Sequence, residues 1–209
     1  LQTTGAFSAG KDLLFKSTMR GVSAGAAPLP EDPEARFETL AEYANRMQNS
    51  VLPIQGPPGS GKTHLSAKLI LNLLLKGKRV GVTALSHKVI ANLLDKVREL
   101  AAQHPEGHAI GALKKKSSTW SGSESDDEPF SFDSVHAALG LLRNGRNVVG
   151  GTTWLWASPQ MRQSVDYLFV DEAGQLALAD VLAASTAARN LLLVGDPRQL
   201  EQPQMGVHP

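Results

Sequence analysis

Hydrophobic residues along the chain fall into two alternating kinds of segment. Short runs that are apolar almost throughout predict buried β-strands, at residues 51–55, 79–83, 147–152, 167–171 and 191–195. In the longer stretches between and before them, apolar residues recur at helical spacing and predict α-helices, at residues 31–47, 64–76, 86–100, 132–142 and 177–189. Because strands and helices alternate and the strands show no polar face, the sequence predicts an α/β fold in which helices cover both faces of a parallel sheet.

Residues at the predicted helix ends fit these boundaries. Acidic residues crowd the start of the 31–47 helix, where the helix dipole favours negative charge. Gly77 is placed to end the 64–76 helix, and Ser86 is placed to cap the helix that follows. The 64–76 helix is apolar on most of its faces, which predicts burial between layers of the fold.

The remaining segments lack such periodicity. We interpret residues 1–30, which are rich in Ser, Thr and Gly, as a linker or the end of a preceding region, with a short helix at 11–20. Residues 31–209 then form one domain, with an exposed excursion at about 105–130. Since the chain starts at Leu1 and not at Met, we expect it to be a piece of a longer protein.

Composition and charge narrow the possible functions. The chain has no cysteine, which excludes disulfides and cysteine-bound metals and suits a cytoplasmic location. No apolar run reaches the roughly 18 residues of a membrane span, so we expect no membrane association. Basic residues dominate positions 62–116 and acidic residues dominate 124–133. This asymmetry fits a polyanionic partner, and it fits an ordinary solvated surface as well.

The segment between the first strand and the 64–76 helix carries the clearest functional pattern. A glycine, four residues and Gly-Lys-Ser/Thr define a phosphate-binding loop, and the chain reads Gly56, Pro57, Pro58, Gly59, Ser60, Gly61, Lys62 and Thr63. Glycines let backbone N–H groups turn toward an anion, and the helix N-terminus adds unpaired donors. Lys62 can then reach the β- and γ-phosphates of ATP, and Thr63 can hold Mg²⁺.

Polar residues also follow two later strands. Asp171 and Glu172 end the 167–171 strand, so Asp171 can hold Mg²⁺ and Glu172 can orient and deprotonate an attacking water. Gln199 follows the last strand and can sense the γ-phosphate or that water, and an ordinary turn with a helix start is the alternative that this stretch favours when it is considered alone.

Other strand ends offer candidate contacts to nucleic acid. Ser86 and His87 follow the second strand, and Thr152 and Thr153 follow the strand at 147–152. Their hydroxyls, imidazole and backbone N–H groups can bind phosphates, while a plain helix cap is the alternative for Ser86. Two tryptophans come next, Trp154 and Trp156, and such a side chain either stacks on a base or packs under a loop.

Three of these stretches resemble motifs I, II and III of superfamily 1 helicases, of the 1B branch that includes the RNA helicase of nonsense-mediated decay. They are the phosphate loop, Asp171-Glu172-Ala173-Gly174-Gln175 and Gly195-Asp196-Pro197-Arg198-Gln199-Leu200. The surrounding residues are similar to the helicase half of bacterial proteins that fuse a RecB-like nuclease to such a helicase. Two positions depart from the family: His87 stands where Asn is frequent, and the glutamine that reads adenine has only Gln48 as a candidate.

The resemblance implies a P-loop NTPase fold, namely the first of two RecA-like domains. It implies ATP and Mg²⁺ as cofactors and single-stranded DNA or RNA, moved 5′-to-3′, as a partner. A second RecA-like domain of the same protein and a RecB-like nuclease upstream are the other implied partners. By position, Lys62 would bind the β- and γ-phosphates, Glu172 would activate water, and Gln199 would couple the γ-phosphate to the second domain.

Three functions fit these patterns. The first is the ATP-binding motor domain of a helicase, and the second is a nucleotide-gated module that binds or remodels nucleic acid without unwinding it. The third is a small-molecule kinase, which leaves the 195–200 stretch unexplained.

Overall fold

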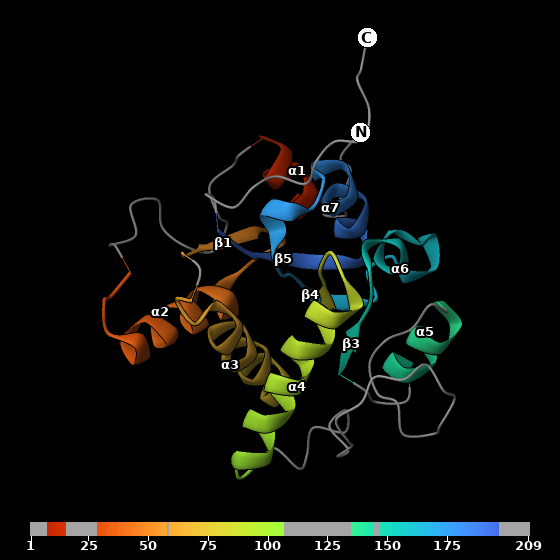
Figure 1. Ribbon diagram of the computed structural model, residues 1–209. Helices are drawn as coiled ribbons and strands as arrows, with labels where there is room; N and C mark the ends of the chain where they lie inside the picture. The colour runs from red at the N-terminus through yellow and green to blue at the C-terminus, as the bar shows by residue number, and fades with distance from the viewer. Residues whose placement is uncertain (1–7, 16–28, 58, 107–134, 144–146, 197–209) are drawn as a thin grey trace.

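The computed structural model describes residues 8–15, 29–57, 59–106, 135–143 and 147–196 (Figure 1). A single five-stranded sheet lies at its centre, and all strand pairs in it are parallel. The strand order is β1-β5-β4-β2-β3. In chain order the strands are β1 (Val51–Gln55), β2 (Val80–Thr83), β3 (Val148–Gly150), β4 (Val165–Val170) and β5 (Ala188–Gly195).

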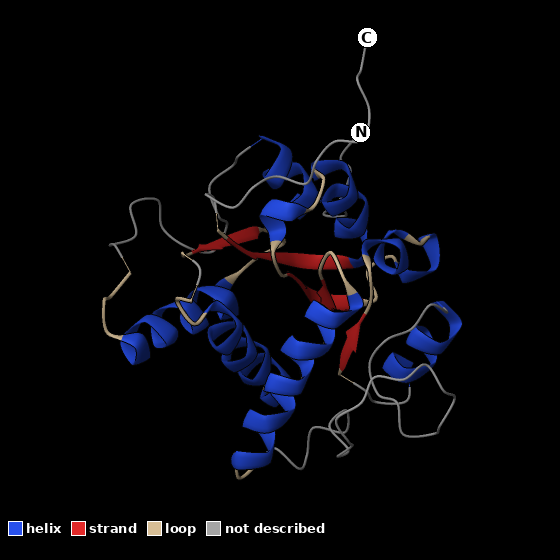
Figure 2. Ribbon diagram, viewed as in Figure 1, coloured by secondary structure: helices blue, strands red, loops and turns tan. Residues whose placement is uncertain are grey.

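Helices cover both faces of this sheet (Figure 2). One face carries α2 (Pro33–Arg46), α3 (Lys62–Leu75) and α4 (His87–Gln103). The other carries α1 (Ser8–Phe15), α5 (Val135–Arg143), α6 (Thr153–Ala157) and α7 (Leu178–Ala184). Short 3₁₀ turns lie at Pro159–Met161, Ala173–Gln175 and Ser185–Ala187. No helix within the described ranges is both long and apolar enough to cross a membrane.

Successive strand residues feed two separate hydrophobic cores. In β4, Tyr167 and Phe169 join the core under α2, α3 and α4, whereas Leu168 and Val170 join the core on the opposite face. This division follows from the period of two in a β-strand. It explains why the strands are apolar throughout, and it confirms the predicted α/β fold with a parallel, doubly covered sheet.

The predicted helix signals act as expected. The Asp32 side chain accepts a hydrogen bond from the Ala35 N–H at 2.8 Å at the start of α2. Gly77 has a φ of +71° after α3, and its N–H and the Lys78 N–H donate to the Leu74 and Leu73 carbonyls. That pair of bonds is the glycine-terminated helix end that the sequence indicated.

One boundary differs from the prediction, and one helix was not predicted. The predicted 177–189 helix is wrong in its second half, because α7 ends at Ala184 and β5 already begins at Ala188. There Ala188 pairs with Val165 of β4, and the Asn190 side chain accepts the Ser50 N–H at 3.2 Å. Sheet pairing therefore overrides the helix propensity of an alanine-rich stretch. The five-residue helix α6 was not predicted, since it is too short for helical periodicity to show.

The segment before residue 31 contains a packed helix. The predicted helix at 11–20 is found as α1, Ser8–Phe15, and residues 16–20 lie outside the described ranges. Ala9 and Asp12 are buried, and the Ser50 hydroxyl donates to the Asp12 carboxylate at 3.2 Å. Most of the predicted excursion at 105–130 also lies outside the described ranges.

The packing around Gly81 generates a stability prediction. A Cβ at Gly81 would lie 2.8 Å from the Trp156 ring and 2.9 Å from Leu168, and both neighbours are fully buried. We expect Gly81→Ala to lower the free energy of unfolding by about 1–3 kcal/mol, as overpacked cores do. Urea unfolding of the two proteins measures the difference.

Gly140 in α5 provides the matched control. Among the described residues, a Cβ there meets no atom within 4 Å beyond its chain neighbours and the nearby backbone of its own helix, so Gly140→Ala should raise the free energy of unfolding by up to about 1 kcal/mol through helix propensity. Equal unfolding midpoints for Gly81→Ala and the wild type would contradict the proposed tight packing around Trp156.

Candidate nucleotide and nucleic-acid site

The phosphate loop connects the end of β1 to the start of α3. Gly59 and Gly61 have φ angles of +75° and +77°, in the left-handed region that glycine adopts without steric cost. The Gly56 N–H donates to the Gly195 carbonyl at 3.2 Å, which ties the start of the loop to the end of β5. Pro58 lies outside the described residues. The loop therefore has the strand, turn and helix context that its sequence pattern requires.

The Lys62 ammonium lies across this loop. Its Nζ is 2.6 Å from the Gly56 carbonyl oxygen and 2.7 Å from the Pro57 carbonyl oxygen. Neutral carbonyls hold the cation in place without cancelling its charge. Lys62 is therefore positioned to receive an anion at the mouth of the loop.

Two adjacent carboxylates follow β4. The Asp171 N–H donates to the Thr83 carbonyl at 2.8 Å, and the Asp171 carboxylate accepts the Glu172 N–H at 2.9 Å. Glu172 itself has φ 50° and ψ 40°, which is a strained backbone conformation for a residue with a side chain. Backbone strain of this kind is concentrated at functional sites, so the conformation of Glu172 fits its predicted role.

Burial changes the electrostatics of Asp171, which is only 6% exposed. Desolvation raises the pKa of Asp171 above its ordinary value of 3.8, and the neighbouring Glu172 carboxylate adds to the rise. The Glu172 N–H and the Lys62 ammonium act in the opposite direction. A buried carboxylate with this environment is stabilised by any cation that binds beside it.

A cavity of about 470 Å³ joins the loop to the two acids. It brings together most of the predicted nucleotide-binding positions and adds two residues of α4 that sequence reasoning missed. Its lining residues are Gly59, Gly61, Lys62, Thr63, Val89, Asn92, Asp171, Glu172 and Gly195. Nothing in the local sequence marks Val89 and Asn92, because they reach the cavity only through the packing of α4 on α3. Gln199 lies outside the described residues, so its predicted role stays a prediction.

A second, smaller cavity of about 180 Å³ lies on the other side of the loop. It is lined by the first turns of α2 and α3 together with loop residues: Pro33, Glu34, Arg36, Phe37, Ser60, Gly61, His64, Leu65 and Lys68. The Lys68 ammonium lies 4.3 Å from the centre of the Phe37 ring and 2.6 Å from the Glu34 carboxylate. Gln48 precedes β1, at the opposite edge of the sheet from this cavity and from the phosphate loop.

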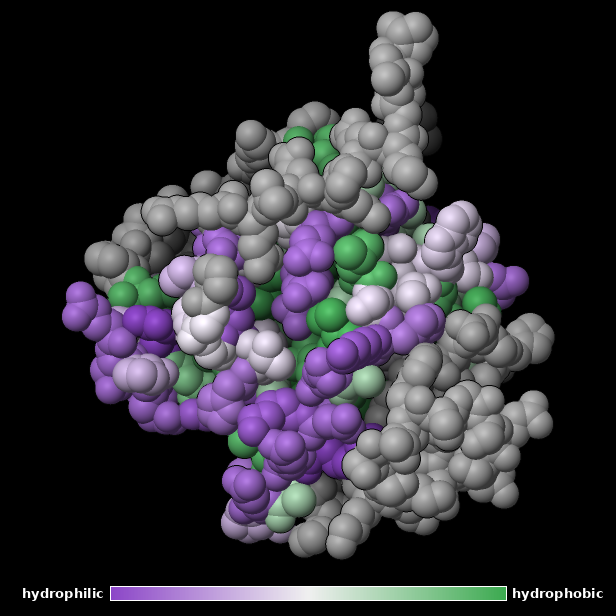
Figure 3. All heavy atoms as spheres, viewed as in Figure 1, coloured by the Kyte–Doolittle hydropathy of each residue, from purple (hydrophilic) through white to green (hydrophobic). Residues whose placement is uncertain are grey.

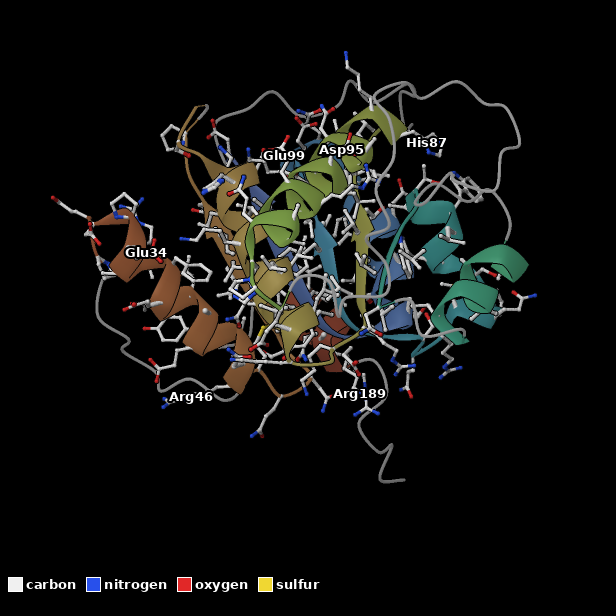
Figure 4. The ribbon with its side chains drawn as sticks, turned by 90° about the horizontal axis from the view of Figure 1, so that it is seen from below. Glu34, Arg46, His87, Asp95, Glu99 and Arg189 are labelled. Carbon is white, nitrogen blue, oxygen red and sulfur yellow. The ribbon has the colours of Figure 1, made fainter. Side chains whose placement is uncertain are left out.

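The predicted nucleic-acid contacts lie at the ends of two neighbouring strands. Because β2 pairs with β3, and the Gly151 N–H donates to the Val82 carbonyl at 3.0 Å, the loops after these strands are adjacent. Thr152 and Thr153 begin α6, and His87 begins α4 on the side facing α6 (Figure 4). Ser86 is a helix cap, since its hydroxyl accepts the Val89 N–H at 3.3 Å.

The two tryptophans of this region have opposite environments. Trp156 is fully buried, and its indole N–H lies 3.0 Å from the Gly151 carbonyl and 3.2 Å from the Val82 carbonyl. Trp154 is 86% exposed. The packing alternative is therefore correct for Trp156, and the stacking alternative stays open for Trp154.

The basic residues along α4 are partly neutralised. Lys96 pairs with Glu99 at 2.6 Å and Arg98 pairs with Asp95 at 2.5 Å, and the two carboxylate residues, Asp95 and Glu99, are exposed on α4 (Figure 4). Ion pairs between residues three apart on one helix are typical of a solvated face. On α4, the basic residues of this part of the sequence are therefore explained by a solvated surface.

Comparison with known proteins assigns the chain to a family. The family described as AAA domain matches residues 38–207. The chain belongs to this family. The match covers β1 to β5, and thus both the loop and the acidic pair. The AAA domain assignment agrees with the parallel sheet and confirms the predicted fold class.

Curated relatives of this AAA domain include two yeast proteins. The DNA replication ATP-dependent helicase/nuclease dna2 of Schizosaccharomyces pombe is 28% identical over 150 residues, which cover 70% of this chain and 10% of that protein. The DNA replication ATP-dependent helicase/nuclease DNA2 of Saccharomyces cerevisiae is 29% identical over 152 residues, with the same shares. The chain thus spans about a tenth of these relatives. They confirm the resemblance to helicases that the motifs indicated.

Among solved structures, the UvsW helicase from bacteriophage T4 superposes with a TM-score of 0.49 at 12% identity, covering 88% of this chain and 58% of that one. A likeness this distant does not bear on function.

The buried carboxylate of the AAA domain generates a pH prediction. Asp171→Asn removes the charge and keeps an oxygen to accept the Glu172 N–H. Because the folded-state pKa of Asp171 lies above its ordinary value of 3.8, ionising it destabilises the folded protein. That loss develops as the pH rises from the ordinary pKa through the folded-state pKa, and it is complete at higher pH. We therefore expect the variant to be more stable than the wild type at neutral pH, and equally stable in acid.

Urea unfolding across this pH range, without nucleotide, measures the difference. Asp180→Asn is the matched control, because Asp180 is exposed in the first turn of α7, where the helix dipole favours its charge. The control should lose a little stability at neutral pH. A neutral-pH stability of Asp171→Asn at or below that of the wild type would overturn the argument.

Proposed function

We propose that this AAA domain binds ATP with Mg²⁺ and hydrolyses it as the motor domain of a superfamily 1 helicase. The cavity that holds Lys62, Thr63, Asp171 and Glu172 together is the observation that carries the proposal. One cationic side chain, one hydroxyl and two carboxylates around a glycine-rich loop are the groups that phosphoryl transfer to water requires. The helicase part of the proposal is supported by the two curated relatives, both of which are named as ATP-dependent helicase/nucleases.

The residues present suit a magnesium ion accompanying the nucleotide. Thr63 and Asp171 offer hard oxygen ligands on the same cavity, and the Lys62 ammonium offsets the burial of the Asp171 charge only in part. Within the described ranges no cluster of three His, Cys, Asp or Glu side chains forms a metal cage. A magnesium ion here would therefore take its remaining ligands from phosphate oxygens and water, as this ion commonly does, and would neutralise charge on the phosphates.

The protein's own groups divide the chemistry between them. Lys62 binds the β- and γ-phosphates, and the loop N–H groups hold the triphosphate against the start of α3. Glu172 orients a water and accepts its proton as the water attacks the γ-phosphorus and the β–γ oxygen leaves with ADP. Gln199 would report the presence of the γ-phosphate to the neighbouring domain.

The small cavity beside Phe37 suits the nucleoside end of ATP. It shares Gly61 with the larger cavity and is also lined by Ser60, whereas Asp171 and Glu172 line the larger cavity only. Its aromatic ring and aliphatic stems fit a flat base better than a phosphate. Glutamine-based reading of adenine by Gln48 does not fit the position of that residue before β1.

The remaining parts of the proposal concern the whole protein. Ser86, His87, Thr152 and Thr153 would contact the phosphates of single-stranded DNA or RNA at the carboxyl edge of the sheet. A second RecA-like domain would close the nucleotide cavity and complete the strand groove, and hydrolysis would drive 5′-to-3′ movement. A nuclease domain upstream, suggested by the helicase/nuclease relatives, and a cytoplasmic location complete the proposal.

Substitutions of Lys62 and Glu172 test this function in the full-length protein. Lys62→Ala should abolish ATP binding, because it removes the cation held over the loop. Glu172→Gln should leave ATP binding intact and lower nucleic-acid-stimulated turnover by at least about 100-fold, since a general base contributes roughly 10²–10⁴ in rate. Nucleotide-binding titration and a phosphate-release assay measure the two effects.

Exposed partners on α4 supply the controls. Lys96→Ala and Glu99→Gln break a surface pair outside the cavity and should change neither measurement. Stimulated turnover of Glu172→Gln at the level of its control would remove Glu172 from the mechanism. Stimulated turnover without strand displacement in the wild type would instead favour a nucleic-acid-remodelling module over a helicase.

A further inference from the structure

Trp154 leaves an unusually large apolar surface in water. At 86% exposure it exceeds every other large hydrophobic side chain that the described ranges leave exposed, the next being Leu14 and Leu178 at 53%. A buried tryptophan covers roughly 150–250 Å², so a partner that covers this ring gains a large contact.

The support beneath Trp154 is rigid. The next two residues of α6, Leu155 and Trp156, are buried, and the Trp156 indole bonds to carbonyls in β2 and in the loop after β3. These contacts fix α6 to the sheet while Trp154 points away from the core. The ring is therefore presented on a fixed platform and loses little conformational freedom when a ligand covers it.

The surroundings of Trp154 suit a polyanion that carries flat apolar groups. The loops after β2 and β3, taken together with the first residues of α4 and the whole of α6 as residues 84–88 and 151–158, contain no carboxylate. They offer an exposed Lys88, the His87 ring and threonine hydroxyls. The carboxylates Asp171 and Glu172 follow β4 and line the nucleotide cavity instead. The neighbouring helix α7 carries one carboxylate, that of Asp180 in its first turn.

Apolar surface continues from Trp154 along this edge of the sheet. Leu85, in the loop after β2, is 39% exposed, and Leu178 begins α7, which packs against α6. In Figure 3, hydrophobic surface shows between the start of α4 and α7. In Figures 1 and 4, α6 lies beside the first turn of α4, where His87 is labelled.

We propose that Trp154 stacks on a base of a single-stranded nucleic acid whose phosphates contact the loops after β2 and β3. Base–aromatic stacking next to a basic, carboxylate-free path is the way in which proteins hold single strands without reading sequence. A duplex cannot use this ring, because its bases already stack on one another. This proposal rests on the nucleic-acid partner of the proposed function. It adds one residue, Trp154, whose contact requires a nucleic acid that carries bases and not only a sugar-phosphate chain.

The test measures the affinity of the full-length protein for two oligonucleotides by fluorescence anisotropy. One is an oligo(dT), and the other has the same length but carries abasic sites throughout. The wild type should bind oligo(dT) roughly 5- to 150-fold more tightly than it binds the abasic strand, because one base stacked on an aromatic ring contributes an affinity gain in this range. Trp154→Ala should lose that preference while binding the abasic strand as the wild type does. Trp154→Phe keeps a ring and should retain part of the preference.

Leu14→Ala is the matched control, because Leu14 is an exposed hydrophobic residue on α1, and it should keep the full preference. An unchanged preference in Trp154→Ala would overturn the stacking role and leave Trp154 to a protein partner. Equal loss of affinity for both strands would overturn it too, since that points to a structural role. A wild type that binds neither strand, and whose turnover neither strand stimulates, would instead refute the nucleic-acid partner of the proposed function.

Discussion

The parallel pairing of β5 with both β1 and β4 is the constraint on which the site depends. Gln55, the last residue of β1, stands opposite Gly195, and Val170, the last residue of β4, stands opposite Leu193. This register brings the phosphate loop and the acidic pair out at nearly the same level of one sheet edge. The bond from the Gly56 N–H to the Gly195 carbonyl then fixes the loop to that edge. A slip of either pairing by one residue would turn core side chains outward, so the two hydrophobic cores hold the register.

The edge so defined carries features that cost stability. Asp171 is buried with a raised pKa, Glu172 has a left-handed backbone, and the loop needs glycine at two left-handed positions. Such features destabilise the folded protein and are concentrated at sites that bind ligands. The buried helix α3 and the double core around the sheet offset them. Such a division, with stability in the sheet and strain at its carboxyl edge, is expected where a rigid scaffold positions a reactive site.

The side chains along this edge change from acidic to neutral and basic farther along the sheet. The strand order places β2 and β3 on the far side of β4 from the phosphate loop. Carboxylates line the nucleotide cavity, whereas the loops after β2 and β3 carry hydroxyls, Lys88 and exposed apolar side chains. Asn92 and Val89 of α4 line the nucleotide cavity, while His87 at the start of the same helix faces α6. One helix therefore borders both regions, and it offers a physical link between the proposed nucleotide site and the proposed site for a single-stranded nucleic acid at the other end of the edge.

The sequence by itself determined the alternation of strands and helices, the phosphate loop and the acidic pair. Local chemistry encodes these features: apolar period, glycine at special φ angles, and polar residues directly after an apolar strand. It could not place the start of β5, because pairing with β4 outweighs the propensity of alanine, nor could it indicate Val89 and Asn92, which reach the cavity only by packing. Trp154 and Trp156 show what the sequence alone could not determine. They stand two residues apart in the same short helix, and sequence allowed the same two roles for both. Only the tertiary structure separated them, since the direction of α6 on the sheet buries Trp156 beneath the β2 and β3 backbone and leaves Trp154 in solvent.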